Sequence, residues 1–94
     1  MIVSFDDRAT EALFCHGTRP RWMAPALADA VVRKLDILDA ASRLADLRVP
    51  PGNRLEALSG ERTGQHSIRI NDQWRICFKW TAVGPMNVEI VDYH

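Results

Sequence analysis

Three neighbouring side chains near the carboxyl end of the chain are able to exchange protons or hydrogen bonds: Asp92, Tyr93 and His94. They follow the apolar run that contains Val88 and Ile90 without a break, so we expect the core to hold them in place. A carboxylate or an imidazole can act as a general acid or base, and a phenol can stack on a base or bind phosphate. The alternative is the solvated end of a strand.

Positive charge is concentrated in the second half of the sequence, although the formal net charge is +0. Residues 48–80 carry six basic side chains against three acidic ones. The basic side chains are Arg48, Arg54, Arg62, Arg69, Arg75 and Lys79. This surplus is compatible with a phosphate-bearing partner. Charge alone, however, favours a solvated sheet face.

If the partner is RNA, these residue types suit cleavage of the strand by its own 2′-hydroxyl. That reaction needs a base for the hydroxyl, cations for the phosphorane and an acid for the leaving 5′-oxygen. Asp92 and His94 can transfer the protons, and Arg69 and Arg75 can hold the phosphate through paired hydrogen bonds. Neither a metal nor a cofactor is required. From the residues alone we infer only a phosphate-binding sheet face.

The composition predicts one domain over residues 1–94. The sequence is 47% hydrophobic and 26% charged, and it contains no run of the ~18 apolar residues that a membrane helix needs. The acidic start MIVSFDD is unlike a secretory signal, so we expect a cytoplasmic protein. Cys15 and Cys77 lack metal-ligand spacing, and we expect both to be reduced, partly buried thiols.

The first half of the sequence predicts two helices. The first covers about residues 6–16, with Ser4 as its cap and Gly17 at its end. The second begins at Pro25 and runs to about Ala41. Its apolar stripe consists of Leu27, Val31, Leu35 and Leu38. After it, we expect Ser42 to cap a short extra turn, and the sequence VPPG to exclude regular structure.

Beyond residue 53 the apolar period shortens from about 3.6 residues to about 2, which predicts strands. The strands are expected at 54–58, 66–70, 74–80 and 87–93, with turns at Asn71-Asp72-Gln73 and Gly84-Pro85. Trp74, Ile76, Phe78 and Trp80 share one side of their strand. The sequence therefore predicts an α+β fold in which the two helices pack on this side of a small antiparallel sheet. The side with Arg75 and Lys79 would then be open to solvent.

Three stretches of the sequence resemble one known family. They are LRVPPGNRLEALSGERTGQHSIRINDQWRICFKW, MIVSFDDRATEALFCHG and EIVDYH. Together they make the chain similar to the HigB, or plasmid-maintenance killer-protein, branch of the RelE/ParE toxin superfamily. The most specific parts are L-x-G-x-R-x-G-x-x-S-I-R-I-N-x-Q-W-R-I at 58–76 and the final D-Y-H.

The resemblance implies a RelE-like fold and the toxin of a type II toxin-antitoxin system. It also implies a ribosome-dependent endoribonuclease that cuts mRNA without a metal or cofactor. The implied partners are the ribosome, mRNA and a HigA-type antitoxin with a helix-turn-helix, through which alone DNA would be contacted. The resemblance implies no membrane partner.

Carried over by position, the resemblance implies a catalytic arginine at Arg75 and a proton-transferring group at Asp92, Tyr93 and His94. Glu56 stands where some relatives have a histidine, and we predict that it too is catalytic. RNA contacts are predicted for Arg54, Arg62, Arg69, Gln73 and Lys79.

Three departures from the family suggest slow or weak cleavage. Glu56 would repel phosphate, Ser59 replaces a frequent lysine, and the net charge is +0. One alternative is the ParE branch, which inhibits DNA gyrase by binding it and has no catalytic residues. Another is a weakened toxin that chiefly binds its antitoxin. The D-Y-H ending favours the nuclease over the gyrase inhibitor.

Overall fold

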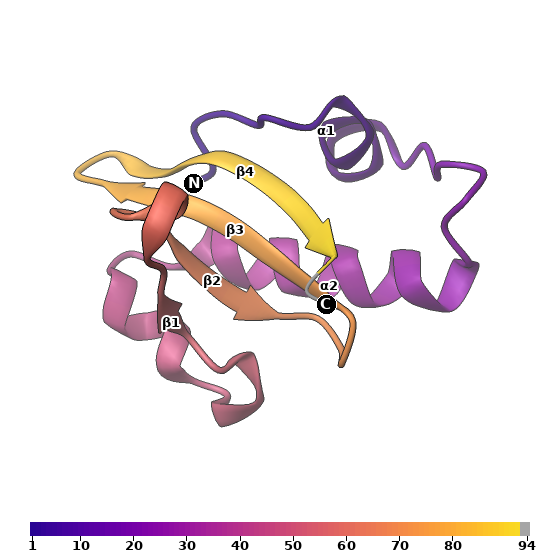
Figure 1. Ribbon diagram of the computed structural model, residues 1–94. Coiled ribbons are helices and arrows are strands. Elements are labelled where there is room, and N and C mark those ends of the chain that lie inside the picture. Colours follow the sequence, from indigo (N-terminus) through magenta and orange to yellow (C-terminus); the bar gives the residue numbers. More distant parts are fainter. Residues whose placement is uncertain (93–94) are drawn as a thin grey trace.

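Two helices precede a sheet and lie on one side of it (Figure 1). The computed structural model describes residues 1–92. The helices are α1 (Arg8–His16) and α2 (Pro25–Ala40), and the longer strands are β2 (His66–Arg69), β3 (Trp74–Thr81) and β4 (Gly84–Asp92). A two-residue strand, β1 (Glu56–Ala57), completes an antiparallel sheet in the order β1-β2-β3-β4. The predicted α+β fold is therefore confirmed.

Helix α1 begins after Asp7, whose carboxylate accepts a hydrogen bond from the backbone N–H of Ala9 at 3.0 Å. The prediction that Ser4 caps this helix is wrong. The Ser4 hydroxyl oxygen instead accepts a hydrogen bond from the backbone N–H of Asn87 at 2.9 Å, which ties the N-terminal segment to β4. The predicted end is confirmed, since Gly17 takes the left-handed conformation at φ 70°.

Helix α2 supplies most of the helical side of the core. Pro25 occupies its first turn, and the helix ends at Ala40, one residue earlier than predicted. In the predicted apolar stripe, Leu27 is only partly buried and the other three residues are fully buried. They join core residues of the sheet, which include Ile76, Phe78 and Val88.

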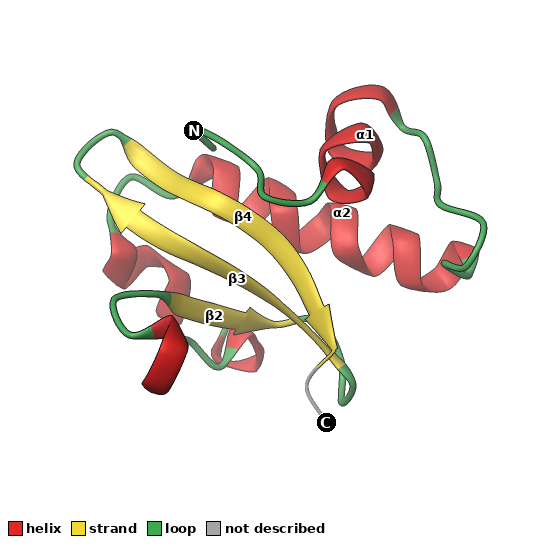
Figure 2. Cartoon of the chain, turned by 45° about the horizontal axis from the view of Figure 1, so that its top comes forward, coloured by secondary structure: helices red, strands yellow, loops and turns green. Residues whose placement is uncertain are grey.

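Strand register decides which side chains share a face of the sheet, because directly paired residues project to the same side. Cys77 is paired with both Ser67 and Glu89, and Arg75 is paired with both Arg69 and Val91. The alternate pairs of the same register, Trp74 with Asp92 and Ile76 with Ile90, project to the opposite face. Figure 2 shows β4 curving beside β3, with the N-terminal segment along its outer edge.

The connection between α2 and β2 is more ordered than the sequence predicted. It contains three 3₁₀ turns: η1 (Leu44–Arg48), η2 (Pro51–Asn53) and η3 (Gly60–Arg62). The prediction that VPPG excludes regular structure is wrong, because Pro51 suits the first position of a short helical turn. The strand predicted at 54–58 shrinks to β1, since Arg54 takes the left-handed conformation at φ 46° and interrupts the extended backbone.

Two local predictions need correction, and a third is confirmed. Ser42 does not cap η1 with its side chain; its backbone N–H donates to the Asp46 carboxylate at 3.0 Å. The turn predicted at Gly84-Pro85 falls just before it, and β4 already begins there. The turn before β3 is confirmed, but it is held by the Asn71 side-chain oxygen, which accepts from the backbone N–H groups of Gln73 and Trp74 at 2.9 Å each.

The two faces of the sheet are covered in different ways. We call the side packed against the helices the helix face; as predicted, Ile76 and Phe78 are fully buried there. We call the other side the polar face; it carries Ser67, Arg69, Arg75, Cys77, Lys79 and Glu89. The prediction that this face is open is wrong for Arg75 and Cys77, which are buried, and right for Lys79. Figure 1 shows the turn at 60–62 in front of the sheet and α2 behind it. Arg62 of this turn reaches Glu89, the cross-strand partner of Cys77, whereas Arg75 is covered by the segment that contributes the Arg54 carbonyl.

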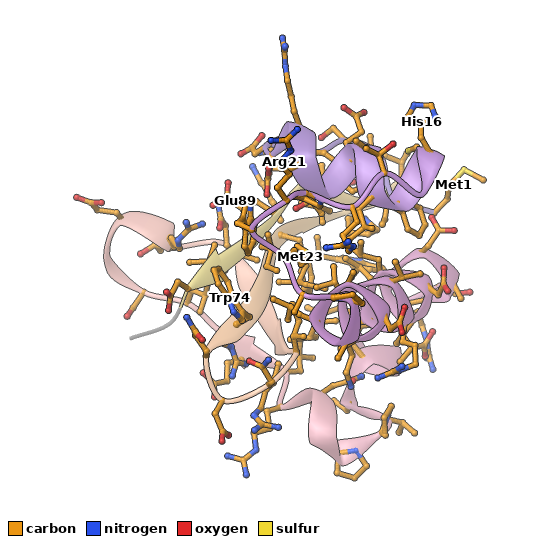
Figure 3. All side chains as sticks on the ribbon, turned by 90° about the vertical axis from the view of Figure 1, so that its right-hand side faces the viewer. Met1, His16, Arg21, Met23, Trp74 and Glu89 are labelled. Carbon is orange, nitrogen blue, oxygen red and sulfur yellow. The ribbon has the colours of Figure 1, made fainter. Side chains whose placement is uncertain are left out.

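The two thiols differ from expectation in their burial, since Cys15 is exposed and Cys77 is buried. Both are free thiols. On α1, Thr10 and Leu13 are buried, whereas His16 is exposed and extends from the outer surface of the helix (Figure 3).

Candidate functional site

Arg75 lies at the start of β3 and is held by neutral oxygens. It is only 7% exposed. Its Nε donates to the hydroxyl oxygen of Ser67 at 2.8 Å, and its Nη2 donates to the backbone carbonyl of Arg54 at 2.6 Å. These bonds fix the plane of the guanidinium without neutralising it. A guanidinium keeps its charge even when buried, so the site contains a permanent, oriented cation.

The carbonyl that binds Arg75 is positioned by a buried asparagine. Asn53 is fully buried, and its Nδ2 donates to the carbonyls of Leu47 at 3.1 Å and Val49 at 3.3 Å. Its Oδ1 accepts a bond of 2.6 Å from Nζ of Lys34 on α2. The next residue, Arg54, takes a left-handed conformation that is uncommon outside glycine. The connection is fastened to the helix, and the helix thereby sets the orientation of Arg75.

Lys34 titrates in an altered environment as a result. Burial lowers the pKa of its ammonium group, and the nearby charges of Arg33 and Arg69 lower the pKa further. The direction is that expected for a cation removed from water beside other cations.

Glu56 is the carboxylate that approaches Arg75. Its Oε1 lies 3.9 Å from Nη2 of Arg75, and its side chain is 53% exposed. Glu56 is paired with Ser67 across β1 and β2, so both side chains lie on the polar face with Arg75. The structure thus brings together three of the predicted site residues, Arg54, Glu56 and Arg75, the first through its carbonyl. An exposed carboxylate beside a fixed cation can accept a proton while the cation holds an anion.

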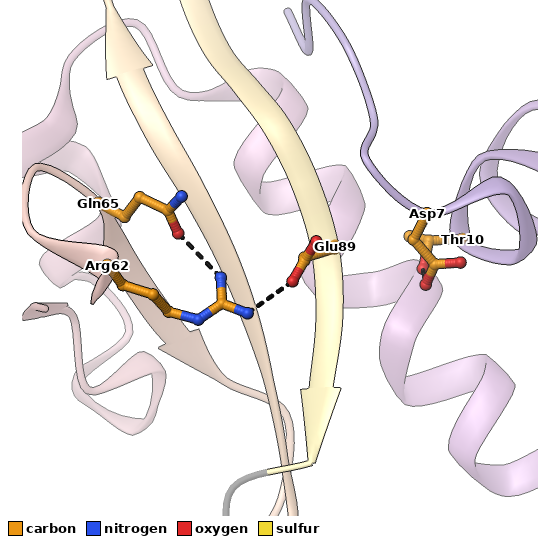
Figure 4. Close-up of polar contacts among 5 residues, drawn as sticks. All are labelled: Asp7, Thr10, Arg62, Gln65 and Glu89. Carbon is orange, nitrogen blue, oxygen red and sulfur yellow. Dashed lines mark hydrogen bonds and ion pairs between the residues drawn. The ribbon is translucent and has the colours of Figure 1, made fainter. Parts of the chain in front are cut away.

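Arg62 forms a polar cover over the middle of the polar face (Figure 4). Its two terminal nitrogens donate to Gln65 Oε1 at 3.0 Å and to Glu89 Oε1 at 2.7 Å. The guanidinium therefore reaches from η3 across β3 to β4. Cys77 is paired with Glu89 in the sheet, and its burial raises the pKa of the thiol. This predicted RNA-binding residue has a carboxylate partner within the chain.

Among the other predicted RNA-binding cations, Lys79 is more accessible than Arg62, and Arg69 is about as exposed as Arg62. Arg69 forms an ion pair with Asp72 in the turn before β3. Lys79 is exposed on the polar face. A surface pair of the Arg69 kind contributes little stability and can exchange its carboxylate for a phosphate.

Arg75, Ser67, Glu56 and the Arg54 carbonyl form the first cluster, on the polar face. A second cluster lies at the same end of the sheet but on the helix face. Nε2 of Gln73 donates to Oδ2 of Asp92 at 3.1 Å. Asp92 is paired with Trp74, whose side chain projects to the face opposite that of Arg75. Asp92 and Arg75 therefore leave the sheet on opposite sides of its edge. Tyr93 and His94, the other predicted members of this group, lie outside the described residues.

Sequence reasoning missed four residues that shape the two clusters. They are Lys34, Asn53, Ser67 and Trp22, the last of which contacts Trp74 with ring centroids 5.2 Å apart. Ser67 could have been found from the sequence, because it lies two residues before Arg69 in a predicted strand and therefore shares the polar side with it. The other three depend on partners far along the chain.

Two surface hollows are lined by residues other than those of the two clusters. One, of about 380 Å³, is lined by Leu44, Ala45, Arg48, Leu55, Ala57 and His66. The other, of about 450 Å³, is lined by Leu13, Phe14, Gly17, Arg19, Pro25, Ala28, Asp29 and Val32. Over residues 1–92, no group of three or more potential metal ligands comes together, and no helix has the length and apolar character to cross a membrane.

Comparison with known proteins identifies the family to which this chain belongs. Residues 3–94 match the HigB-like toxins, described as the RelE-like toxin of the type II toxin-antitoxin system HigB. The chain is 44% identical over 80 residues to Toxin HigB-1 of Vibrio cholerae serotype O1, an alignment covering 85% of this chain and 84% of that protein. It is also 42% identical over 50 residues to an uncharacterized protein of Haemophilus influenzae, covering 53% and 50% of the two chains. This chain therefore belongs to the HigB-like family of RelE-like toxins from type II toxin-antitoxin systems, and an antitoxin is its expected partner.

Proposed function

We propose that this toxin is an endoribonuclease that cuts mRNA on the ribosome by attack of the 2′-hydroxyl on the adjacent phosphate. The observation that carries the proposal is the buried, oriented guanidinium of Arg75 with the exposed carboxylate of Glu56 3.9 Å away. A fixed cation beside a proton acceptor is the minimum that this reaction needs. No metal is required for it.

Each group has a role in the proposed reaction. Glu56 takes the proton of the 2′-hydroxyl as its oxygen forms a bond to phosphorus. Arg75 stabilises the charge that grows on the phosphorane oxygens, and its rigid mounting means that little reorganisation accompanies the step. The bond from phosphorus to the 5′-oxygen then breaks, leaving a 2′,3′-cyclic phosphate, and His94 donates the proton to the leaving oxygen.

The other predicted residues assist the proton transfers or bind the RNA. Asp92, which Gln73 orients, assists the proton transfers, and the same role is assigned to Tyr93. The cations and the amide predicted to contact RNA are Arg54, Arg62, Arg69, Lys79 and Gln73. Because Arg62 and Arg69 each have a carboxylate partner in the chain, RNA has to compete with Glu89 and Asp72 for them. This competition agrees with weak cleavage.

The partner proposed for neutralisation is a HigA-type antitoxin with a helix-turn-helix. The toxin would act in the cytoplasm, where ribosomes and messages occur, and would contact DNA only through that antitoxin.

Replacement of Arg75 tests the proposal most directly. We expect Arg75→Ala and Arg75→Lys to lower cleavage of a translated message by about 100- to 1000-fold, since lysine cannot reproduce the paired donors of the guanidinium. Cleavage is mapped by primer extension on purified ribosomes. Arg43→Ala is the control, because the Arg43 side chain is 79% exposed and lies outside both clusters.

Stability must be measured beside activity, because Arg75 is buried. Arg75→Lys keeps a cation in place and should stay folded by circular dichroism, so its loss of cleavage reports on catalysis. Wild-type cleavage by folded Arg75→Lys and Arg75→Ala would refute the proposed role. A wild-type protein that blocks DNA supercoiling by gyrase without cutting mRNA would point to the ParE-like alternative. One that binds the antitoxin but cuts nothing would be a weakened toxin.

A further inference from the structure

The loop between α1 and α2 presents an exposed indole beside the second cluster. Trp22 is 55% exposed, although a side chain of this size usually buries most of its surface. Its ring lies on that of Trp74, with centroids 5.2 Å apart and planes inclined by 33°. The other large hydrophobic side chains left exposed in residues 1–92 are aliphatic: Met1, Val3, Val49 and Val83.

The loop that carries Trp22 is fixed. Met23, the next residue, is 1% exposed and anchors the loop in the core (Figure 3). The carbonyl of Met23 accepts a bond of 2.6 Å from the Arg19 guanidinium, and its N–H donates to the carbonyl of Pro20 at 3.1 Å. Trp22 is therefore held out in one position, and a ligand that stacks on it would meet a preorganised surface.

The indole pair lies at the end of the sheet where β3 begins and β4 ends, next to the residues of the proposed reaction. Trp74 is paired with Asp92 across the strands and follows Gln73, which donates to Asp92. On the other side, Trp74 is followed by Arg75, whose side chain leaves β3 on the polar face. A strand of RNA that runs round this edge with a phosphate at Arg75 therefore brings a neighbouring nucleotide to the tryptophans.

We propose that Trp22, backed by Trp74, is a stacking platform for one unpaired nucleobase of the message. This inference rests on the proposed endoribonuclease function. A base needs only an exposed aromatic face and polar groups at its rim, and Arg21, Gln73 and Asp92 are exposed polar neighbours of the pair in the chain or across the strands. A protein partner would instead favour a broader apolar patch around the indole.

Three variants test the platform. In Trp22→Ala, we expect kcat/KM for cleavage of a ribosome-bound message to fall about 5- to 150-fold, mainly through KM, as for loss of one stacked base. Trp22→Phe keeps an aromatic face and should retain most of the activity. Val83→Ala removes an exposed apolar side chain from the β3–β4 turn, at the other end of the sheet, and should match the wild type. Affinity for the antitoxin is measured in parallel and should not change in any variant.

The outcomes separate the two proposals. Unchanged cleavage by Trp22→Ala, in a wild type that does cleave, overturns the platform and leaves the endoribonuclease standing. Weaker antitoxin binding by Trp22→Ala also overturns it and assigns the indole to the antitoxin interface. A wild type that does not cut mRNA removes the endoribonuclease and the platform together.

Discussion

Both faces of the sheet contain buried side chains, but the two faces bury them by opposite means. On the helix face, Ile76, Phe78 and Val88 pack against the apolar stripe of α2. On the polar face, Arg75 and Cys77 are just as inaccessible, yet they lie under a connection held by hydrogen bonds and an ion pair. Apolar burial is non-directional, whereas a polar cover is stable only if each buried donor meets its acceptor.

This difference separates stability from orientation. The helix face provides the larger share of the folding free energy, because it removes apolar area from water. The polar face contributes less, but it determines where one guanidinium points. Substitutions on the first face should therefore change stability in proportion to volume, and substitutions on the second should change activity more than stability.

The largest effect is expected from Phe78→Ala on the helix face. Removal of a fully buried aromatic side chain leaves a cavity and should lower the free energy of unfolding by about 3–5 kcal/mol. Urea unfolding followed by circular dichroism measures it. Val83→Ala, at an exposed site, should change the same free energy by less than about 0.5 kcal/mol. A small effect at Phe78 would mean that the helix face does not dominate the core.

A smaller loss of stability is expected from Asn53→Ala, together with a loss of cleavage. The variant removes the donor to two carbonyls and leaves the Lys34 ammonium without its acceptor, at a cost of about 1–3 kcal/mol. Because the Arg54 carbonyl is then no longer fixed, cleavage should fall more steeply than stability. Lys34→Met keeps the asparagine donor bonds and serves as the matched variant, with a milder effect on both. If Asn53→Ala were as active as the wild type, the segment at Asn53 and Arg54 would not control the orientation of Arg75.

The smallest effect on stability is expected from Arg62→Gln, which opens the polar cover. Its ion pair with Glu89 is partly exposed and contributes under about 1 kcal/mol, less at high salt. The sensitive measurement is the reactivity of Cys77 with DTNB in a Cys15→Ser background. Burial raises the pKa of the Cys77 thiol and shields it, so it should react slowly until Arg62 is replaced. A thiol that reacts equally fast in both proteins would show that Arg62 covers nothing.

The elements that depend on neighbouring residues could be predicted from the sequence. Pro25 and Gly17 mark a helix start and a helix end, and the alternation from Trp74 to Trp80 gives the strand and its covered side. These signals are local, because backbone conformation and apolar period act within a few residues.

The arrangement of the site could be predicted only in part. The grouping of Glu56 with Arg75 follows from antiparallel pairing, which puts both side chains on the polar face. The burial of Arg75 did not follow, because it depends on the left-handed Arg54 and thus on Asn53 and Lys34. Contacts between residues so far apart leave no periodic trace. The same holds for the indole pair, whose members come from a loop and a strand.

The pairing of the N-terminal segment with β4 has a consequence for the order of synthesis. Phe5 forms a parallel bridge with Val88, and the backbone groups of Ser4 and Asp6 bond to Val88 on either side. In a chain emerging from the ribosome, this N-terminal segment has no partner until β4 has been made. The core therefore closes only after Val88 has been synthesised. A product truncated before Val88 can complete neither the fold nor the proposed site.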